Sequence, residues 1–477
     1  MNPSTEFIGI VAFCKNRGIG KGNTIPWNLK DDIQFFKTIT TNNVVIMGRK
    51  TYDSIPEKHK PLKNRMNIVL TNTPGAYTSN HENLVYLTFN EVPQILDKCT
   101  NYPRCKVFIA GGNDIYNLFY DRMDSIYVTY IEKEYEVDTH FRQITDHFCL
   151  ANNSARHWSS EEQCFYRFLK YEKNNKKQHN PDHTYIDLVK KVLVKEDTVR
   201  SNRTGVDTIS IFGEQISFDI STHVPLLTTK RVAWKSCIEE LLWFMRGDTD
   251  ANILKARNVS IWNGNSSRDF LDKVGLNHLE EGDCGANYSF QWRHFGQKYS
   301  DCKTGYVKNT KYDQISNIIK LLKTDPFSRR IFMSAWNPID LDKTVLPPCH
   351  VSAQFYVEKN PARPGGKLSL SCHMYQRSCD VFLGLPFNIF SYTMLTYILA
   401  KKCDMEPDRL IISLGDTHIY SNHIGQAKMQ LERTALAQPK IIVSEEVVNK
   451  EIEEITINDF ELVGYFPHNS IKAPMVV

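Results

Sequence analysis

The sequence predicts two consecutive folds: an α/β domain with a central, mostly parallel sheet and flanking helices, then an α+β domain with a large mixed sheet. Unbroken Val/Ile runs alternate with short helical stretches up to Lys173, whereas longer helices and alternating strands follow residue 182. A polar stretch without apolar periodicity separates these regions. We therefore expect a first domain over 1–173, a short linker over 174–181 and a second domain over 182–477.

The first domain is expected to alternate strands and helices. Each expected strand is a short apolar run bounded by Gly, Pro or polar residues, a pattern typical of buried parallel strands. These runs are residues 7–14, 42–48, 66–72, 83–89, 105–112, 125–132 and 164–173. Segments between them predict helices over 31–40, 90–99 and 113–122.

The second domain is expected to open with a helix over 184–197 and to contain longer helices over 235–247 and 386–403. The last is almost wholly apolar, so it should lie in the core, and its apolar part is too short to cross a bilayer. Residues 350–358 and 367–377 alternate polar and apolar side chains, as strands with one buried face do.

Composition excludes several classes of protein. A net charge of +4 over 477 residues gives no broad basic surface, so we expect no need for nucleic acid. No run of 18 apolar residues occurs, and the first residues lack the pattern of a secretory signal, so we expect no membrane association. Twelve cysteines are scattered without CxxC pairs, which favours reduced thiols in the cytoplasm and no metal site.

Two strand–helix junctions in the first domain could bind phosphate. One is the GRKT segment 48–51, and the other contains Gly111 and Gly112. Free backbone N–H groups at helix N-termini favour anions, and cations at the first junction add charge. Two ordinary turns would have the same pattern, so these glycines alone leave both interpretations open.

Asp32 lies at the start of an expected helix whose other face carries Ile33 and two phenylalanines. A carboxylate among apolar groups is desolvated and can take part in proton transfer. Alternatively, Asp31 and Asp32 interact with the positive end of the helix dipole. We prefer the dipole interpretation for Asp31, and both interpretations stay open for Asp32.

Four segments of this domain, residues 9–29, 44–56, 61–72 and 107–116, resemble dihydrofolate reductase in order and spacing. The resemblance implies NADPH-dependent reduction of dihydrofolate, with Asp32 as the pterin-binding acid and Arg65 holding the folate α-carboxylate. It implies further folate contacts from Trp27, Phe36 and Thr129. The implied NADPH contacts are Ala12, Ile19 (in the mobile loop over the site), Gly48, Arg49, Lys50 (at the 2′-phosphate), Thr51, Thr71, Gly111, Gly112 and Tyr116.

Cys349 is the candidate nucleophile of the second domain. It follows two prolines, so a rigid turn could direct its thiol into a cavity. A single cysteine is more often a buried small hydrophobic residue, but arginines nearby would favour the thiolate and bind phosphate. Together they predict attack on a phosphorylated substrate. The arginines in compact motifs are Arg203, Arg329, Arg330 and Arg377.

Six segments, residues 203–213, 239–250, 328–338, 346–357, 375–388 and 415–423, resemble thymidylate synthase. The resemblance implies that Cys349 attacks C6 of dUMP, which makes C5 a nucleophile. C5 then takes the one-carbon unit of 5,10-methylenetetrahydrofolate, which returns a hydride and leaves as dihydrofolate. The first domain would reduce that dihydrofolate again.

The same resemblance implies roles for other residues. Glu240 would organise water and proton transfer, and Asn388 would read the uracil edge. Asp380 would bind the pterin and, through its backbone, the pyrimidine. Arg329 and Arg330 match a pair that reaches the phosphate in the neighbouring subunit, which implies a homodimer through this domain. Further implied ligands are Arg203, Arg377 and Ser378 for the phosphate, His418 and Tyr420 for the 3′-hydroxyl, and Trp262, Asn263 and Tyr288 for the folate.

The sequence departs from these families at several positions. Ala110 stands before the Gly pair where a larger aliphatic residue is usual, and Tyr52 replaces a common Trp. Asn287 and Ser289 flank Tyr288 where the synthases have other residues, so the loop there is expected to lie differently.

Two other functions deserve comparison. A pyrimidine nucleotide hydroxymethylase fused to a reductase would use the same cysteine adduct, but enzymes acting on cytosine tend to have Asp at the position of Asn388. A catalytically dead nucleotide- or RNA-binding relative should have lost Cys349, Asp32 or an arginine, and none is lost. His418 alone would read as an ordinary loop histidine, and only its motif indicates binding.

Overall fold

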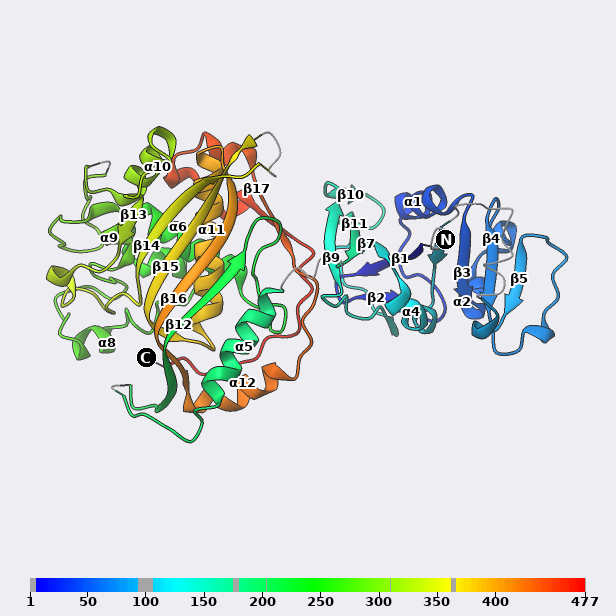
Figure 1. The fold of residues 1–477 in the computed structure, drawn as a ribbon, viewed down its shortest axis with the longest axis horizontal. Coiled ribbons are helices and arrows are strands. Elements are labelled where there is room, and N and C mark those ends of the chain that lie inside the picture. Colours follow the sequence, from blue (N-terminus) through cyan, green and yellow to red (C-terminus); the bar gives the residue numbers. More distant parts are fainter. Residues whose placement is uncertain are drawn as a thin grey trace. The chain divides into compact units, whose positions relative to one another are not determined.

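The computed structural model describes residues 6–92, 106–174, 180–202, 204–308, 310–361 and 366–476. It divides into two compact units, Met1–Gln178 and His179–Val477, coloured blue to cyan and green to red in Figure 1. Most of the expected linker 174–181, most of the expected helix 90–99 and the whole of Arg203 lie outside the described residues. Within the described ranges, no helix is both long and apolar enough to cross a bilayer.

The first unit contains a sheet in the order β10-β11-β7-β1-β6-β3-β4-β5, with β9 paired to β11. Every pair from β7 to β5 is parallel, and β11 runs antiparallel to β7, β9 and β10. The expected mostly parallel sheet is therefore confirmed. Its strands are β1 (Phe7–Cys14), β3 (Val44–Gly48), β4 (Met66–Leu70), β5 (Leu84–Leu87), β6 (Val107–Ile109), β7 (Ser125–Ile131), β9 (Phe148–Asn153), β10 (His157–Ser159) and β11 (Cys164–Lys173).

Short helices connect these strands and cover them. The helices are α1 (Lys30–Thr40), α2 (Arg49–Ser54) and α4 (Asn113–Phe119), and a separate ribbon pairs β2 (Gly18–Gly20) with β8 (Thr139–His140). Phe36 and Ile39 of α1 pack against the core, but Ile33 is 62% exposed, so the apolar face expected around Ile33 was wrong. The ribbon and strands β9 and β10 are short or polar, and their sequences did not predict them.

The second unit contains a five-stranded mixed sheet in the order β12-β16-β15-β14-β13, in which β15 and β16 are parallel and the other pairs antiparallel. The mixed sheet was expected, whereas the long strands β12 and β16 were not. Helix α11 packs on β15 and β16, α6 packs against α11, and α11 is buried along most of its length, as expected (Figure 1). The strands are β12 (Thr208–Asp219), β13 (Phe332–Ser334), β14 (His350–Lys359), β15 (Leu368–Asp380), β16 (Glu406–Tyr420), β17 (Lys440–Val443) and β18 (Phe460–Val463). The helices are α5 (Pro181–Leu193), α6 (Trp234–Arg246), α7 (Ala251–Lys255), α8 (Arg268–Lys273), α9 (Tyr288–His294), α10 (Gln314–Thr324), α11 (Gly384–Lys402) and α12 (Ile424–Leu431).

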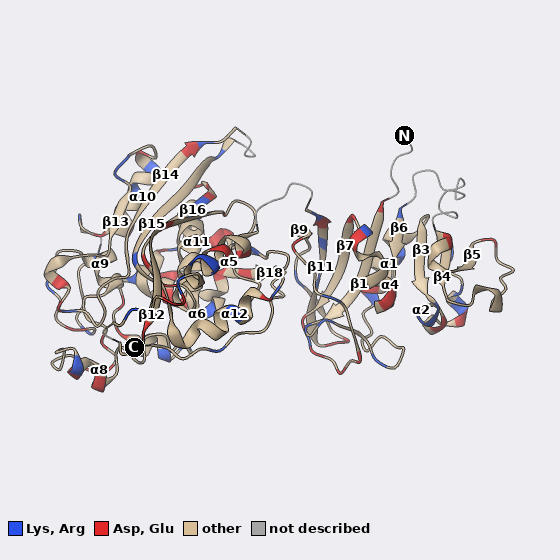
Figure 2. Cartoon of the chain, turned by 60° about the horizontal axis from the view of Figure 1, so that its bottom comes forward, with Lys and Arg blue, Asp and Glu red and all other residues tan. Residues whose placement is uncertain are grey.

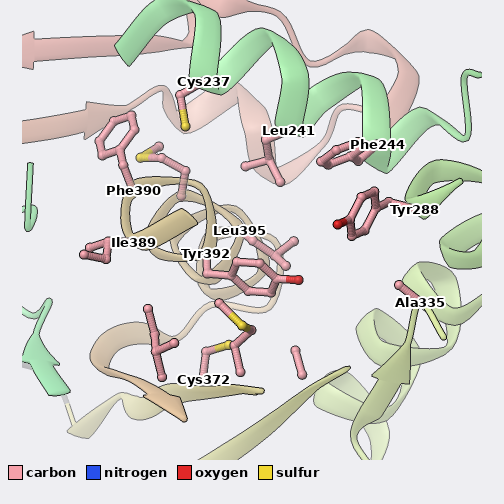
Figure 3. Close-up of a cluster of buried hydrophobic side chains, with 14 of the residues drawn as sticks. Cys237, Leu241, Phe244, Tyr288, Ala335, Cys372, Ile389, Phe390, Tyr392 and Leu395 are labelled. Carbon is pink, nitrogen blue, oxygen red and sulfur yellow. The ribbon is translucent and has the colours of Figure 1, made fainter. Parts of the chain in front are cut away.

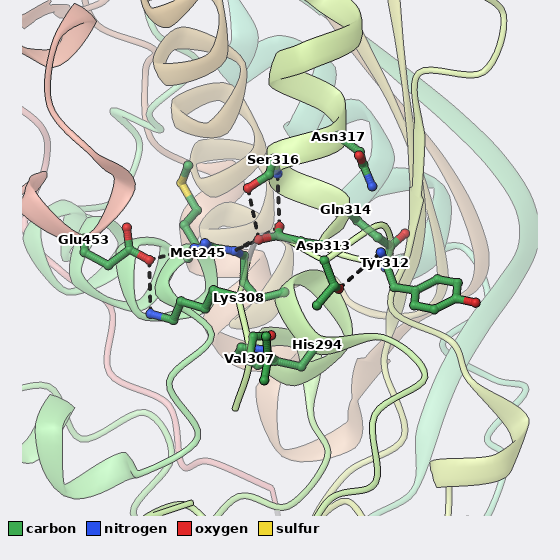
Figure 4. Close-up of polar contacts among 12 residues, drawn as sticks. Met245, His294, Val307, Lys308, Tyr312, Asp313, Gln314, Ser316, Asn317 and Glu453 are labelled. Carbon is green, nitrogen blue, oxygen red and sulfur yellow. Dashed lines mark hydrogen bonds and ion pairs between the residues drawn. The ribbon is translucent and has the colours of Figure 1, made fainter. Parts of the chain in front are cut away.

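A buried ion pair joins α9 to α10. Arg293 Nε lies 3.0 Å from Asp313 Oδ1, and both side chains are almost fully buried. Asp313 also caps α10 through Ser316, and Glu453 links Arg293 to Lys308 (Figure 4). A charge buried this deeply is tolerated only when it is paired. The contact between Arg293 and Asp313 therefore holds α9 and α10 together.

Lys and Arg are interspersed with Asp and Glu over the elements of both units (Figure 2). This mixture agrees with the small net charge of +4. Any anion site must therefore depend on a few placed cations rather than on a broad field.

Candidate active sites

The carboxylate of Asp32 lies against the central sheet of the first unit. Thr129 Oγ1 donates to Asp32 Oδ1 at 2.6 Å, and Thr129 pairs with Ala12 across β7 and β1. Burial raises the pKa of Asp32, and the hydrogen bond from Thr129 lowers it by less. Asp31 instead accepts a hydrogen bond from the Tyr166 hydroxyl. The structure therefore favours the desolvated interpretation of Asp32.

Aromatic and cationic side chains are among the other predicted folate contacts of this unit. Trp27 is 8% exposed, and its indole Nε1 has no hydrogen-bond partner among the described residues. The Arg65 guanidinium lies 5.9 Å from the ring of Phe36 and donates to Thr40 Oγ1 at 3.1 Å. These side chains come from a loop, from α1 and from the residue before β4, so an acid, an apolar ring and a guanidinium share one region.

The two Gly-containing junctions meet. The Gly48 amide donates to Gly111 O at 2.7 Å, and a Cβ on Gly112 would lie 3.3 Å from Thr51 Oγ1. Gly111 has φ +106°, and a Cβ there would contact the ring of Tyr116 at 3.4 Å. The positive φ of Gly111 is a backbone conformation that favours glycine, and a side chain on Gly112 would press against Thr51.

Some of the other residues predicted to contact NADPH lie near these two junctions, whereas Ile19 lies in a separate ribbon. Tyr116 donates to Ile10 O at 2.6 Å, and Thr71 follows β4, whose end pairs with Gly48. Arg49 pairs with Asp53 at 2.6 Å, and Lys50 is exposed. Ile19 belongs to the separate β2–β8 ribbon.

Cys349 of the second unit sits in a turn held on two sides. Its amide donates to the Tyr288 hydroxyl at 2.6 Å. The Arg377 side chain donates to Pro348 O at 2.8 Å and to Pro347 O at 2.7 Å, and the Arg377 amide donates to Cys349 O at 2.8 Å. The cysteine, one arginine and the tyrosine are thus brought together from three elements distant in sequence.

A buried aromatic cluster backs this turn. His350 stacks on Tyr288 with centroids 4.0 Å apart, and its Nδ1 lies 3.0 Å from the Tyr392 hydroxyl. Burial lowers the pKa of His350 to about 3, so this ring is neutral at physiological pH. Figure 3 shows Phe244, Tyr288 and Tyr392 converging from α6, α9 and α11. The cluster restricts how far the turn can move.

Glu240 of α6 accepts a hydrogen bond from Trp262 Nε1 at 2.8 Å. Burial raises the pKa of Glu240 to about 7, and the bond from Trp262 opposes this rise only in part. A carboxylic acid with this pKa can exchange protons near neutrality, which suits acid–base chemistry.

The ends of β15 and β16 bring further predicted residues together. Asp380 pairs with His418 in register, and its Oδ1 accepts from the amides of Phe382 and Leu383 at 3.0 and 3.1 Å. His418 Nδ1 lies 2.9 Å from Asp416 Oδ1. Tyr420 lies beside His418, with ring centroids 5.2 Å apart.

Not every predicted residue joins this group. Arg329 and Arg330 are exposed between α10 and β13, and within the described chain neither makes an ion pair. Asn263 is exposed as well. The loop departure at Asn287 has a local effect: its side chain caps α9 by accepting from the amide and hydroxyl of Ser289 at 3.1 and 3.0 Å.

Sequence reasoning missed two residues of this region. Gln376 Nε2 donates to Asn388 Oδ1 and to Ser378 O, both at 3.1 Å, so it orients two predicted ligands. Lys230 is buried and donates to Phe382 O, and burial lowers its pKa to about 7. The sequence held one signal for Gln376: a polar residue at a position where an expected strand should be buried needs hydrogen-bond partners.

Comparison with known proteins identifies the family of each unit. The dihydrofolate reductase family model matches residues 6–173, and the thymidylate synthase model matches residues 183–477. A curated protein of Paramecium tetraurelia, named bifunctional dihydrofolate reductase-thymidylate synthase, is 42% identical over all of both chains. Relatives with that name from Arabidopsis thaliana (number 1) and Leishmania major are 39% and 37% identical, covering 100% and 98% of this chain and 97% and 94% of theirs.

Folds and matches together define a two-enzyme chain, an oxidoreductase followed by a methyltransferase. The chain belongs to the bifunctional dihydrofolate reductase–thymidylate synthase family. It carries out thymidylate synthesis and dihydrofolate reduction. Neither a hydroxymethylase nor an inactive binding protein is supported.

Proposed function

We propose that residues 182–477 form a synthase domain that methylates dUMP through a covalent bond from Cys349 Sγ to C6. The observation that carries this proposal is the turn of Cys349, held by Tyr288 and by Arg377. Attack at C6 makes C5 nucleophilic, so C5 can take the one-carbon unit of 5,10-methylenetetrahydrofolate. C5 then loses its proton, the folate gives a hydride to the new carbon and leaves as dihydrofolate, and the bond from Cys349 Sγ to C6 breaks to release dTMP.

The surrounding residues are assigned to steps of this reaction. Glu240, with its pKa near 7, organises water and moves protons. Asn388, oriented by Gln376, reads the uracil edge, and Asp380 holds the pterin. We assign the phosphate to Arg203, Arg377 and Ser378, the 3′-hydroxyl to His418 and Tyr420, and the folate face to Trp262, Asn263 and Tyr288.

Residues 1–173 are proposed as the reductase domain, joined through the linker 174–181. Asp32 holds the pterin with Thr129 behind it, Trp27 and Phe36 wall the pocket, and Arg65 binds the α-carboxylate. The buried, unpartnered Nε1 of Trp27 is a donor that suits a polar ligand.

NADPH supplies the hydride when bound, and the joined glycine junctions suit it. Gly48, Gly111 and Gly112 let backbone amides approach a pyrophosphate closely. Lys50 is exposed at the start of α2, where an ammonium can meet the 2′-phosphate. Ala12, Ile19, Arg49, Thr51, Thr71 and Tyr116 complete the proposed contacts.

A homodimer through the synthase domain is supported by an exposed sheet face. Phe332, Tyr356 and Tyr375 are 50%, 61% and 43% exposed on adjacent strands β13, β14 and β15. Arg329 and Arg330 lie just before β13, are exposed, and form no ion pair within the described residues. A second copy would cover the aromatic rings and receive the arginines at its phosphate site. Sedimentation equilibrium should give a dimer, and a monomer at micromolar concentration would contradict this proposal.

We also propose a cytoplasmic location, supported by the ten described cysteines, all of which are free thiols.

One experiment tests the synthase assignment directly. The chain is mixed with 5-fluoro-dUMP and methylenetetrahydrofolate and examined by intact-mass and peptide mass spectrometry. Since fluorine at C5 cannot leave as a proton does, we expect a trapped complex on the peptide containing Cys349. Absence of any adduct, in a preparation that reduces dihydrofolate with NADPH, would remove Cys349 from the proposal.

A further inference from the structure

The turn between β10 and β11 contacts the loop that carries Trp27. The Glu162 carboxylate in this turn uses both oxygens: Oε1 accepts from the Asn28 amide at 2.6 Å, and Oε2 accepts from the Tyr135 hydroxyl at 2.5 Å. Lys133 Nζ donates to Glu162 O at 2.8 Å. The Glu162 side chain is 14% exposed, so these contacts are shielded from water.

Both hydrogen bonds lead to Trp27. Asn28 is the next residue in the chain, and the ring of Tyr135 packs edge-on against the indole of Trp27 with centroids 5.4 Å apart. One carboxylate therefore restrains Trp27 through its main chain and through the ring beside it. The indole belongs to a buried cluster that also contains Leu29.

The charges around Glu162 favour its ionised form. Burial raises the pKa of Glu162, but the hydrogen bonds from Asn28 and Tyr135 and the charge of Lys133 outweigh it, so the pKa lies below its usual value. Burial, followed by contact with Glu162, raises the pKa of Tyr135, which keeps its proton as a donor. A carboxylate that accepts two bonds is a stronger restraint than a neutral acceptor.

The restraint extends to the start of α1. Asp31 accepts from Tyr166 and Asp32 accepts from Thr129, so β7 and β11 hold the segment after Asn28. Glu162 adds a restraint at Asn28, where that segment begins, four residues before Asp32. The orientation of the folate wall and of the acid thus depends on the same strand pair.

We propose that Glu162 is a positioning residue of the reductase, which holds Trp27 against the folate through Asn28 and Tyr135. This inference rests on the proposed reductase site. It assigns a function to a turn that none of the expected folate or NADPH contacts includes.

The test compares four variants of the full chain: Glu162→Ala, Glu162→Gln, Tyr135→Phe and Glu161→Ala. Glu161 is the matched control, because it is the preceding residue and its carboxylate pairs with the exposed Lys30 at 2.9 Å. Glu162→Ala removes both bonds to the carboxylate and should raise the KM for dihydrofolate about tenfold, an effect the size of one hydrogen bond to a charged group, because these bonds act on the folate only through Trp27. Glu162→Gln keeps one acceptor oxygen and should show a smaller rise.

Other readouts separate positioning from general damage. The KM for NADPH, the thymidylate synthase rate and the behaviour of Glu161→Ala should match wild type. Amide hydrogen exchange at Asn28 should be faster in Glu162→Ala. Combining Glu162→Ala with Tyr135→Phe should cost less than the sum of the single effects, because both break one linkage.

Additive effects, an unchanged dihydrofolate KM, or an equal loss in Glu161→Ala would overturn the proposal. If the wild-type chain does not reduce dihydrofolate, the proposed reductase function fails. In that case the exchange rate at Asn28 still decides whether Glu162 holds the loop.

Discussion

Replacing Glu240 with Gln tests the electrostatics of the synthase site. The pKa of Glu240 is raised from 4.5 to about 7, chiefly by burial. The folded chain therefore binds this proton more tightly than the unfolded chain, so the free energy of unfolding falls as the pH rises from 4.5 to about 7. Above that window the cost of the buried charge is fully present.

The size of the effect follows from the shift. The rise in pKa from 4.5 to about 7 corresponds to roughly 3 kcal/mol, of which about 2 kcal/mol develops between pH 5.5 and pH 8. Gln has nearly the same shape, keeps an oxygen for Trp262 and cannot ionise. The stability advantage of Glu240→Gln over wild type should therefore be about 2 kcal/mol larger at pH 8 than at pH 5.5. This corresponds to a difference in melting temperature on the order of 4 °C.

Scanning calorimetry of the full chain at both pH values measures this difference. The synthase transition is the one that dUMP moves to higher temperature. Glu239→Gln serves as the control: Glu239 pairs with Arg257 at 2.6 Å, so its neutralisation should not stabilise the fold at high pH. A pH-independent difference for Glu240→Gln, or one of opposite sign, would refute the reasoning.

Three further predictions concern the two activities. Cys349→Ala should abolish dTMP formation and leave NADPH oxidation with dihydrofolate intact; loss of both activities would contradict independent sites. Asp32→Asn should lower the reductase rate at neutral pH by about 10²- to 10⁴-fold and spare the synthase; a retained reductase rate would remove Asp32 from the mechanism. Chains carrying Cys349→Ala and Arg329→Ala, each inactive as a synthase, should regain activity when unfolded together and refolded, because one site of each mixed dimer is then intact. No recovery, in mixtures shown to contain mixed dimers, would argue against a shared phosphate site.

Local patterns were sufficient for much of the fold. Val44–Gly48 and Val107–Ile109 are apolar without interruption, and the structure buries them as parallel strands. The helix around Leu395 is almost wholly apolar, which predicted its place in the core. The motif around Cys349 indicated a nucleophile because its proline pair and arginines are unusual in combination.

Polar strands and several contacts were beyond such patterns. Strand β9 and the long strand β12 carry mixed side chains, so their pairing depends on partners far away in sequence. Asp32 illustrates the same limit: its sequence was equally compatible with a dipole-stabilising residue and a desolvated acid, and its burial against Thr129 favours the desolvated acid.

The amino-acid order thus carried the two fold classes, the candidate nucleophile Cys349 and the order of the enzymes, since each depends on residues close together in the chain. Three-dimensional packing alone revealed that Gln376 orients Asn388, that Glu162 reaches Asn28, and that Glu240 titrates near neutrality. The physical reason is that hydrogen-bond partners and loss of solvent are properties of neighbours in space, which a linear sequence does not specify.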